Sequence, residues 1–334
     1  MYFLCGTMLK QFINLQHLLK TFPDEQTCID YLYHLRPECP RCNHPKVWRF
    51  KNGSRFKCAG CKRQFTMKTG TIFENSNITL QQWFILIYLH TKFKKGVNSY
   101  LAADEADITQ KTSWYRLQAI REILAQNQPK QMAGVVEADG TWVGGKNKNR
   151  HMNKRVRKNT DKTVVFGMLS RSSGQVKTQI VKSEEATETH PIILATLHKN
   201  WTIITDDNGG YNGLNQWYNH VQLNRSAYQY VGPLKEGSLQ SSHTNKQAHT
   251  NGIEGFWPWI DRAVMGTYHK ISPKYLQLYL NECTFRYNTR KLSQDDRMKL
   301  ALSYRHEKTS YKKIKAKQKP KAEPKFYFRP NKRN

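Results

Sequence analysis

Three acidic residues lie at the ends of apolar segments in a chain that is otherwise strongly basic. Asp139 follows the segment VVEA, Asp206 ends WTIITD, and Glu254 lies in HTNGIEGFW at the expected start of a helix. Carboxylate oxygens are the ligands that Mg²⁺ prefers, and nearby lysine and arginine would hold a polyanion. As a set, the three acids indicate a magnesium site for phosphate chemistry.

Each acid also has an ordinary structural interpretation. Asp139 with Gly140 matches a common hairpin turn. Asp206 fits a turn or cap after a strand, and Glu254 suits the first turn of a helix, where the helix dipole favours a negative charge. The chemical interpretation therefore depends on the three residues together and not on any one of them.

Four of the seven cysteines form two CxxC pairs. Cys39 and Cys42 make the first pair, Cys58 and Cys61 the second, with fifteen residues between them. Each pair can turn as a knuckle, so four thiolates reach one ion in the tetrahedral shell that suits Zn²⁺. A redox dithiol is the alternative for a single CxxC, but two pairs at this spacing favour one structural zinc ion in a zinc ribbon. The other three cysteines are expected to be buried free thiols.

The charge balance points to a nucleic acid partner. Among 334 residues, 54 Lys and Arg stand against 25 Asp and Glu, a formal charge of +29, which is typical of proteins that bind a polyanion. The longest apolar run, residues 83–89, is too short to span a membrane. The first ten residues lack the pattern of a signal peptide. We therefore expect a cytoplasmic protein, associated with the nucleoid in a bacterium.

Hydrophobic periodicity predicts helices before residue 129 and mixed elements after it. Two short amphipathic patterns cover residues 11–35, and the segments 99–106 and 111–124 suggest a helix-turn-helix, although an ordinary helical bundle fits them as well. The later segments are rich in Val, Ile and Thr. The expected strands are 134–143, 162–170, 175–181 and 201–206, and the expected helices are 183–200, 252–265 and 274–290.

A second concentration of positive charge follows Asp139. Residues 146–162 carry eight Lys or Arg and one Asp. A solvated loop between two strands would have this composition, but its place beside Asp139 favours a clamp on DNA phosphates. The expected DNA contacts in it are Lys154, Arg155, Arg157 and Lys158. On the last expected helix, Arg286, Asn288 and Arg290 fit either a DNA-facing or a structural role.

The motifs, taken in order, resemble those of a known enzyme family. CPRC and CAGCKRQFTMKTGTIFE precede EADGTWVGGK, TDDNGGY, HTNGIEGFWPWIDRAVMGTYH and YLNECTFRYNTR. Together they cover residues 14–290 and closely resemble the zinc-ribbon insertion-sequence transposases of the DDE class, which are ISXO-like and related to the eukaryotic Merlin transposases. The resemblance implies a DNA transposase with a ribonuclease H-like α/β core.

The resemblance also implies roles for the acids. Asp139 and Asp206 would be the first two metal-binding carboxylates, and the third position falls on Glu254 or, alternatively, on Asn251. Two Mg²⁺ ions would activate the attacking water or 3′-hydroxyl and stabilise the leaving oxygen. The chemistry would be cleavage at a transposon end and joining of its 3′-OH to target DNA. The implied partners are double-stranded DNA, as terminal inverted repeats and target, and further copies of the chain in a homo-oligomer.

Two features depart from the family pattern. The stretch from Asp206 to Glu254 is longer than usual, with a polar insertion near LKEGSLQSSHTNKQ. Pro258 lies four residues after Glu254, where its ring would disturb the carbonyl of residue 254 in a continuous helix. These departures leave a second interpretation open, a non-catalytic zinc-ribbon DNA-binding protein such as an inactive or domesticated transposase copy.

The sequence thus predicts a multidomain protein with an α/β core. The expected regions are N-terminal helices (1–35), a zinc ribbon (36–70), a helical, helix-turn-helix-like DNA-binding region (71–128), a ribonuclease H-like DDE transposase core (129–292) and a basic, disordered tail (293–334).

Overall fold

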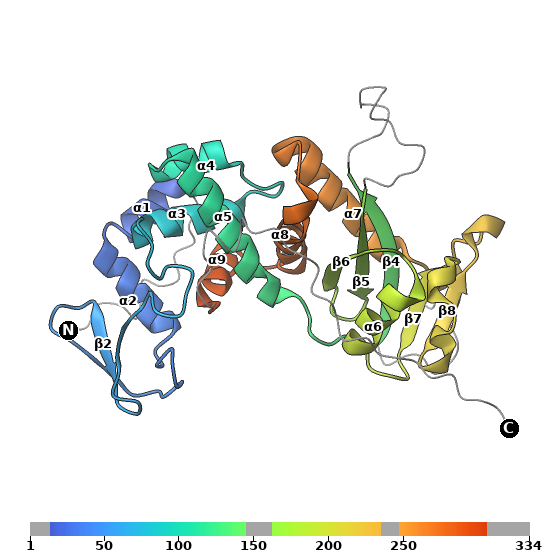
Figure 1. The fold of residues 1–334 in the computed structure, drawn as a ribbon, viewed down its shortest axis with the longest axis horizontal. Coiled ribbons are helices and arrows are strands. Elements are labelled where there is room, and N and C mark those ends of the chain that lie inside the picture. The colour runs from blue at the N-terminus through green and yellow to red at the C-terminus, as the bar shows by residue number, and fades with distance from the viewer. Residues whose placement is uncertain (1–13, 145–161, 235–246, 306–334) are drawn as a thin grey trace.

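The computed structural model describes residues 14–144, 162–234 and 247–305. A small sheet and a group of helices occupy one end of the molecule, and a five-stranded sheet occupies the other (Figure 1). Helix α8 (Leu276–Asn288) lies between them in this view. Within the described ranges, no helix is long and apolar enough to cross a membrane.

Two short helices open the described chain. α1 (Leu15–Thr21) and α2 (Glu25–Leu35) are each capped at the start by an acidic or amide side chain, Asn14 and Asp24, which accept hydrogen bonds from the backbone three residues later. Such caps satisfy backbone N–H groups that have no partner within the helix. The break between the helices falls at Pro23, as the periodicity predicts.

The cysteine region folds around a three-stranded antiparallel sheet. Its strands are β1 (Val47–Arg49), β2 (Arg55–Cys58) and β3 (Gln64–Thr66), in the order β1-β2-β3. Phe56 on β2 is fully buried and stacks on Tyr33 of α2 with ring centroids 5.1 Å apart. The aromatic contact attaches this small sheet to the N-terminal helices.

Three further helices build the core of this half. α3 (Leu80–Lys92) begins with a capping box of Thr79 and Gln82, and almost all of its length is buried. α4 (Ser99–Ala106) and α5 (Gln110–Leu124) are joined by a turn in which Asp107 adopts a left-handed conformation. The predicted pair of helices with a tight connection is therefore present.

The structure corrects the expectation of a tail without structure from residue 293. Residues 294–303 form α9 (Gln294–Ser303), capped by Ser293. Met298, Ala301 and Leu302 are buried in the same hydrophobic core as α1 to α5. The helix was missed because its few apolar residues are followed closely by the Lys-rich sequence. Residues 306–334 lie outside the described ranges.

The larger sheet has the strand order β6-β5-β4-β7-β8. β4 (Val135–Val143), β5 (Thr163–Ser170) and β6 (Val176–Val181) are antiparallel neighbours. β7 (Thr202–Asp206) runs parallel to β4, and β8 (Asn219–Leu223) parallel to β7. The four predicted strands are confirmed. β8 was not predicted, because its short polar sequence NHVQL does not alternate in the way a half-buried strand usually does.

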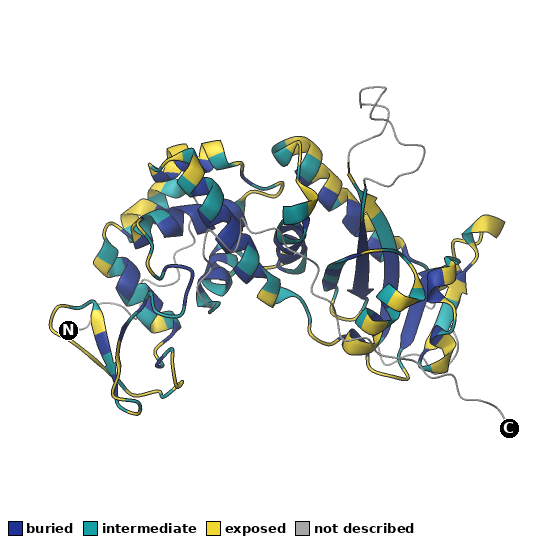
Figure 2. Ribbon diagram, in the orientation of Figure 1, coloured by how far each residue is buried: buried dark blue, intermediate teal, exposed yellow. Residues whose placement is uncertain are grey.

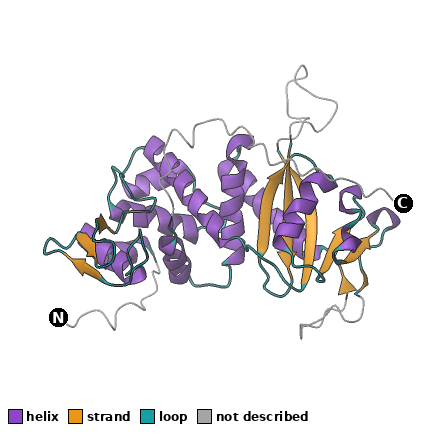
Figure 3. Ribbon diagram, turned by 60° about the horizontal axis from the view of Figure 1, so that its bottom comes forward, coloured by secondary structure: helices purple, strands orange, loops and turns teal. Residues whose placement is uncertain are grey.

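Helices cover both faces of this sheet (Figure 3). α6 (Ala186–Thr196) packs against the face that carries Val136 and Ala138 of β4. α7 (Asn251–Ala263) and α8 pack against the opposite face, which carries Val165 and Leu169 of β5. Side chains alternate between faces along a strand, so both faces of β4 and β5 are buried (Figure 2). Short 3-10 helices, labelled η, connect the main elements of this half: η4 (Gly209–Tyr211), η5 (Leu214–Gln216), η6 (Arg225–Ala227) and η8 (Pro273–Tyr275). A further one, η1 (Ala125–Asn127), follows α5. Two short strands, β9 (Gly232–Pro233) and β10 (Gln247–Ala248), pair with each other.

α7 continues through Pro258 and ends in a π-helical turn, η7 (Val264–Tyr268). Proline removes one N–H donor from a helix and crowds the carbonyl four residues earlier, which here belongs to Glu254. The departure noted in the sequence therefore does not interrupt the helix, and Glu254 lies in its first turn.

A buried ionic network joins α8 to the helices of the other half. Glu282 is fully buried and accepts a hydrogen bond from Arg121 of α5 at 2.6 Å, while Arg286 also pairs with it and donates to the backbone carbonyl of His90. Asn288 bonds both backbone groups of Val176 on β6. Arg286 and Asn288 therefore make contacts within the protein, which supports the structural role over the DNA-facing one.

Candidate active site and metal centre

The strand register places Asp139 and Asp206 side by side. β4 and β7 are parallel, and the last paired residues are Glu137 and Ile204. Asp139 and Asp206 each follow two residues later, so they reach the same level of the sheet. Residues two apart in a strand point to the same face. Both carboxylates therefore lie on the face that α7 covers.

The carboxylate of Asp139 is buried beneath α7. Only 7% of the residue is exposed, and the indole Nε1 of Trp257 donates a hydrogen bond to its Oδ2 at 2.9 Å. The residue opposite on β5 is Gly167, where a Cβ atom would lie 2.4 Å from the Trp257 ring. Burial raises the pKa of Asp139 to about 6, although the Trp257 hydrogen bond lowers it. The negative charges of Asp206 and Glu254 raise this pKa further.

Asp206 ends β7, and the chain turns sharply after it. The backbone N–H of Asn208 donates to Asp206 Oδ1 at 3.2 Å. Burial raises the pKa of Asp206, while this hydrogen bond and the positive charge of Arg225 lower it. A carboxylate in a partly buried position needs such compensation, because loss of water destabilises its charged form.

Glu254 projects from the first turn of α7 and is paired with Arg225 of η6. The Arg225 guanidinium donates to Glu254 and, at 2.8 Å, to the hydroxyl of Thr250, which itself donates to Glu254 at 2.6 Å. Side-chain exposure is 31% for Arg225 and 42% for Glu254. The pair is therefore open to solvent on one side.

Asn251, the alternative third ligand, does not cap α7. Thr250 occupies the capping position, and Asn251 is the first helical residue, with an exposed side chain. The N-terminal turn is bound instead by Glu137, a buried carboxylate on β4 that accepts a hydrogen bond from the backbone N–H of Ile253 at 2.9 Å. Gly252 permits this approach, since a Cβ there would lie 2.7 Å from the Glu137 carboxylate.

Asp139, Asp206 and Glu254 do not form a closed ligand shell, and Glu254 is paired with Arg225. Arg225 lowers the pKa of both aspartates. Within the described ranges, the ligand atoms of three or more His, Cys, Asp or Glu lie within 4.8 Å of one another at the four cysteines alone. The arrangement is thus an acidic site whose charge is partly neutralised by an arginine.

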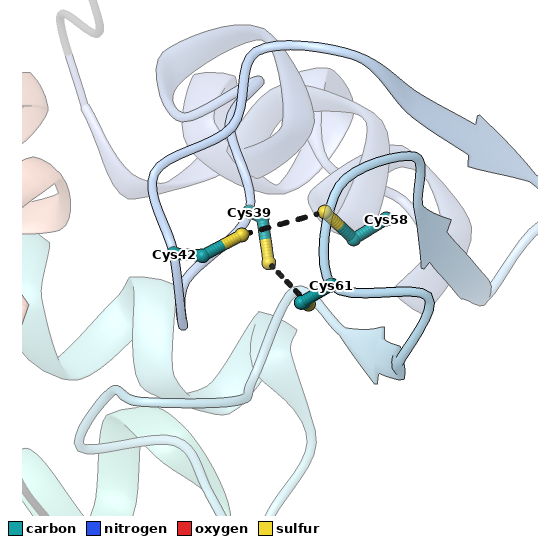
Figure 4. Close-up of side chains that lie close together, drawn as sticks. All are labelled: Cys39, Cys42, Cys58 and Cys61. Carbon is teal, nitrogen blue, oxygen red and sulfur yellow. Dashed lines mark hydrogen bonds between the residues drawn. The ribbon is translucent and has the colours of Figure 1, made fainter.

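The four cysteines of the two CxxC pairs converge on one point (Figure 4). The Sγ atoms of Cys39 and Cys61 are 3.8 Å apart, and those of Cys42 and Cys58 are 3.5 Å apart. A tetrahedron of thiolates around Zn²⁺, with Zn–S bonds of about 2.3 Å, has edges of about 3.8 Å. The cluster therefore has the ligand type, number and spacing to bind zinc.

Each knuckle supplies backbone hydrogen bonds to its sulfur atoms. The backbone N–H of Gly60 donates to Cys58 Sγ at 3.3 Å. The backbone N–H of His44 lowers the pKa of Cys42 to about 6 in the same way, whereas burial raises the pKa of Cys58 to about 11. Thiolate charge in such a cluster is compensated by these dipoles and by a bound cation.

Comparison with known protein families gives a match over the sheet and its helices. Residues 131–288 match the model of the ISXO2-like transposase domain. Over these residues the chain is similar to ISXO2-like transposases. The matched residues run from just before β4 to the end of α8, so they include all three candidate acids and exclude the cysteine cluster.

Two individual proteins are similar to the chain. An uncharacterized protein in the transposable element ISH50 of Halobacterium salinarum is 28% identical over 218 residues, which cover 59% of this chain and 72% of that protein. A chain of the simian T-cell lymphotropic virus intasome, solved in complex with PP2A regulatory subunit B56 gamma, is 12% identical. Its match covers 59% of this chain and 66% of that chain with a TM-score of 0.27, a likeness too weak to bear on the fold.

The region matched by the family model contains a fourth acid that sequence reasoning missed. Glu184 precedes α6 and accepts a hydrogen bond from the Asn208 amide at 2.9 Å. Burial raises its pKa, and the charge of Asp206 raises it further. The absence of a side chain at Gly140 gives Glu184 room, because a Cβ there would lie 2.7 Å from its carboxylate. The sequence SEEATET offers no signal that sets this glutamate apart.

Trp257 and Glu137 could have been recognised from spacing. Trp257 follows Glu254 by three residues, which places the two side chains on neighbouring positions of one helical face. Glu137 precedes Asp139 by two, which places both on one face of a strand. Arg225 had no such signal, since it is one of 54 Lys and Arg.

The predicted DNA contacts Lys154, Arg155, Arg157 and Lys158 lie outside the described residues.

Proposed function

We propose that the chain is a DNA transposase that cleaves transposon ends and joins the new 3′-OH to target DNA by two-metal-ion phosphoryl transfer. The observation that carries this proposal is the register that places Asp139 beside Asp206 inside a transposase domain, with Glu254 above them on α7. We also infer that residues 129–292 adopt a ribonuclease H-like core. The strand order and the antiparallel β5 support that inference.

The donor set fits magnesium. Burial raises the pKa of both Asp139 and Asp206, and the charge of Asp206 raises the pKa of Asp139 further. A divalent cation relieves such repulsion between nearby carboxylates. Asp139 and Asp206 would hold the ions, with Glu254 as the third ligand and Asn251 as the alternative. Bound Mg²⁺ would supply Lewis-acid stabilisation of the attacking and leaving oxygens.

The residues of the chain have the task of holding these carboxylates in place. Trp257 fixes one oxygen of Asp139, and the backbone of Asn208 fixes one oxygen of Asp206. In the first reaction, a water oxygen attacks the phosphorus at the transposon end, the P–O3′ bond breaks, and the 3′ oxygen takes up a proton. In the second reaction, that 3′-OH attacks a phosphodiester of the target, whose own 3′ oxygen leaves.

We propose that Cys39, Cys42, Cys58 and Cys61 bind one structural Zn²⁺. The sulfur spacing and the backbone N–H groups support this assignment. With four protein ligands the shell would be closed, so the ion would stabilise residues 36–70 and take no part in the reaction.

We propose double-stranded DNA as the partner, both as terminal inverted repeats and as target. The charge of +29 supports this proposal, because phosphate contacts supply much of the affinity for DNA. The candidate contacts are residues 146–162 and the helix pair α4 and α5. Because two transposon ends must be brought together, a homo-oligomer is expected. The site of action would be the cytoplasm, or the nucleoid of a bacterium.

A second candidate function is non-catalytic DNA binding. The ion pair of Arg225 with Glu254 favours it, because a glutamate held by an arginine is not available to a metal ion. The two functions differ in one measurable property, the cutting of DNA that depends on a divalent metal.

The test is a nicking assay on a duplex that carries the inverted repeats flanking the gene. The transposase proposal predicts a nick at the repeat end with Mg²⁺ or Mn²⁺, none with EDTA, and none with Asp206→Asn, which should still bind the duplex. Asp261→Asn, an exposed acid on α7, serves as the control and should cut. A chain that binds the repeats but cuts under no divalent metal would be the non-catalytic protein.

A further inference from the structure

Arg225 is paired with Glu254, one of the three candidate acids. It starts η6, the short turn after β8, and its guanidinium bridges Thr250 and Glu254 at the start of α7. It is also close enough to Asp139 and Asp206 to lower the pKa of each. One cation therefore pairs with a carboxylate of the helix and also acts electrostatically on two carboxylates from the strands.

The turn that carries Arg225 is fixed to the same site. The hydroxyl of Ser226 donates to Asp207, the residue after Asp206, at 2.6 Å, and the backbone N–H of Ser226 donates to the same oxygen at 3.3 Å. Asn224 caps the turn by accepting from the backbone N–H of Ala227 at 3.0 Å. Arg225 is thus held beside the acids by contacts on both sides of it in the chain.

The ion pair between Arg225 and Glu254 can be exchanged for a contact with another anion. Its pair with Glu254 is partly exposed on both sides, and ion pairs open to water contribute little net stability. A DNA phosphate offers a guanidinium two oxygens in the fork geometry that arginine matches best. Arg225 can therefore exchange the Glu254 carboxylate for a phosphate, which leaves the Glu254 carboxylate available to another cation.

We propose that Arg225 is a resident counter-ion that couples metal binding to DNA binding. Without DNA it neutralises the acidic site and keeps Glu254 from a divalent cation. When a phosphodiester enters the site, the guanidinium of Arg225 moves to the phosphate, and Glu254 becomes free to bind the metal. By linkage, the metal then tightens DNA binding by the same factor. This inference rests on the proposed function, because it takes Asp139 and Asp206 as metal ligands.

The experiment measures Mn²⁺ binding by titration calorimetry on the full chain with its zinc retained, with and without a short duplex. Signal from the duplex alone is subtracted. We expect DNA to tighten Mn²⁺ binding of the unmodified chain by at least fivefold, within the roughly 5–150-fold range usual for coupled sites. Arg225→Gln should bind Mn²⁺ more tightly than the unmodified chain without DNA, and DNA should then add less than about twofold.

A matched control is Arg262→Gln, which removes the same charge from an exposed position on α7. It lies eight residues after Glu254, about 12 Å along the helix axis, beyond the range of most exposed charge interactions in physiological salt. This variant should behave like the unmodified chain. Equal effects of the two substitutions would reduce the role of Arg225 to net charge and overturn the proposal.

Further variants separate the possible failures. Asp206→Asn should lose Mn²⁺ binding; if it binds as the unmodified chain does, the metal site and the proposed function are both wrong. If Asp206→Asn loses binding but Arg225→Gln leaves both the Mn²⁺ affinity and the DNA effect unchanged, the coupling inference alone is wrong. Should Arg225→Gln fail to fold, Arg225→Lys replaces it. Lysine keeps the charge without the fork, so the DNA effect should shrink, and an undiminished effect would overturn the inference.

Discussion

The indole of Trp257 reaches Asp139 across the space left by Gly167. These two residues, Trp257 on α7 and Asp139 on β4, share a hydrogen bond of 2.9 Å in a buried position. Gly167 faces Asp139 on β5 and presents no side chain there. One candidate metal ligand is therefore oriented by a neutral donor from the helix that also carries Glu254.

Gly167→Ala should disturb this relationship. The added Cβ would lie 2.4 Å from the Trp257 ring, so the indole must move away and the hydrogen bond to Asp139 would be lost. We expect metal-dependent cleavage to fall by about tenfold or more, since a hydrogen bond to a charged group contributes about 1.5–3 kcal/mol. Overpacking should also lower stability by about 1–3 kcal/mol. Cleavage rates and thermal melting measure the two effects.

The control for this substitution is Gly255→Ala on α7. A Cβ at Gly255 would meet nothing within 4 Å, and alanine favours a helix over glycine by up to about 1 kcal/mol. This variant should melt at the same or a higher temperature and should cut at the normal rate. If Gly167→Ala cut as fast as Gly255→Ala, the Trp257 contact would have no part in the reaction.

Asp139→Asn should stabilise the metal-free chain while abolishing cleavage. The pKa of Asp139 is raised from 3.8 to about 6, so the folded chain retains a proton that the unfolded chain has released in that interval. Stability is therefore lost as the pH rises through this window, by up to about 3 kcal/mol at 1.36 kcal/mol per pH unit. Asparagine avoids this cost at pH 7.5 and can still accept from Trp257.

Thermal melting in EDTA at pH 7.5 and pH 5 checks this expectation. The melting temperature of Asp139→Asn should exceed that of the unmodified chain at pH 7.5, and the difference should shrink at pH 5. Asp261→Asn, with an exposed side chain, should show no such gap. A lower melting temperature for Asp139→Asn at pH 7.5 would mean that the ionised carboxylate stabilises the fold.

Removal of zinc should unfold the cysteine region. So small a sheet buries little apolar surface, and four thiolates bound to one ion supply stability that a larger hydrophobic core would otherwise provide. Metal analysis should find about one zinc per chain, and Cys58→Ser should lower that content and weaken DNA binding. Cys28→Ala, at a buried cysteine outside the cluster, should keep the zinc. Absence of zinc together with unchanged DNA binding in Cys58→Ser would contradict the assignment.

The parts of the fold that could be predicted are those set by local pattern. The strands at Asp139 and Asp206 follow from apolar runs, and the cysteine cluster follows from spacing. The contacts of Arg225 could not be predicted, because they join η6 to the start of α7 over 25 to 29 positions, and no local pattern specifies such a contact. The position of Glu184 could not be predicted for the same reason, because this residue lies in the crossover connection between β6 and β7. α9 was missed because four apolar residues in a polar context give a weak periodic signal.

The basic segment 146–162 gives a prediction that depends on its charge alone. If Lys154, Arg155, Arg157 and Lys158 contact phosphates, replacing all four with glutamine should weaken binding to every DNA sequence alike. The slope of log K against log[salt] should become shallower by roughly 0.9 for each lost contact. Filter binding at several salt concentrations measures the slope. An unchanged slope would assign these residues to a loop that does not touch DNA.

The third metal ligand can be identified by comparing Glu254 with Asn251. Glu254 lies in the first turn of α7 near the aspartates, whereas Asn251 is exposed at the helix start. Mg²⁺ prefers anionic oxygen, and a third carboxylate offsets more of the charge of two divalent ions. Glu254→Gln should therefore abolish Mg²⁺-dependent cleavage at the transposon end while DNA binding and folding persist, because glutamine retains the size of the side chain. Asn251→Ala should leave measurable cleavage. The opposite pattern in the same nicking assay would make Asn251 the ligand and would leave Glu254 as a partner of Arg225 alone.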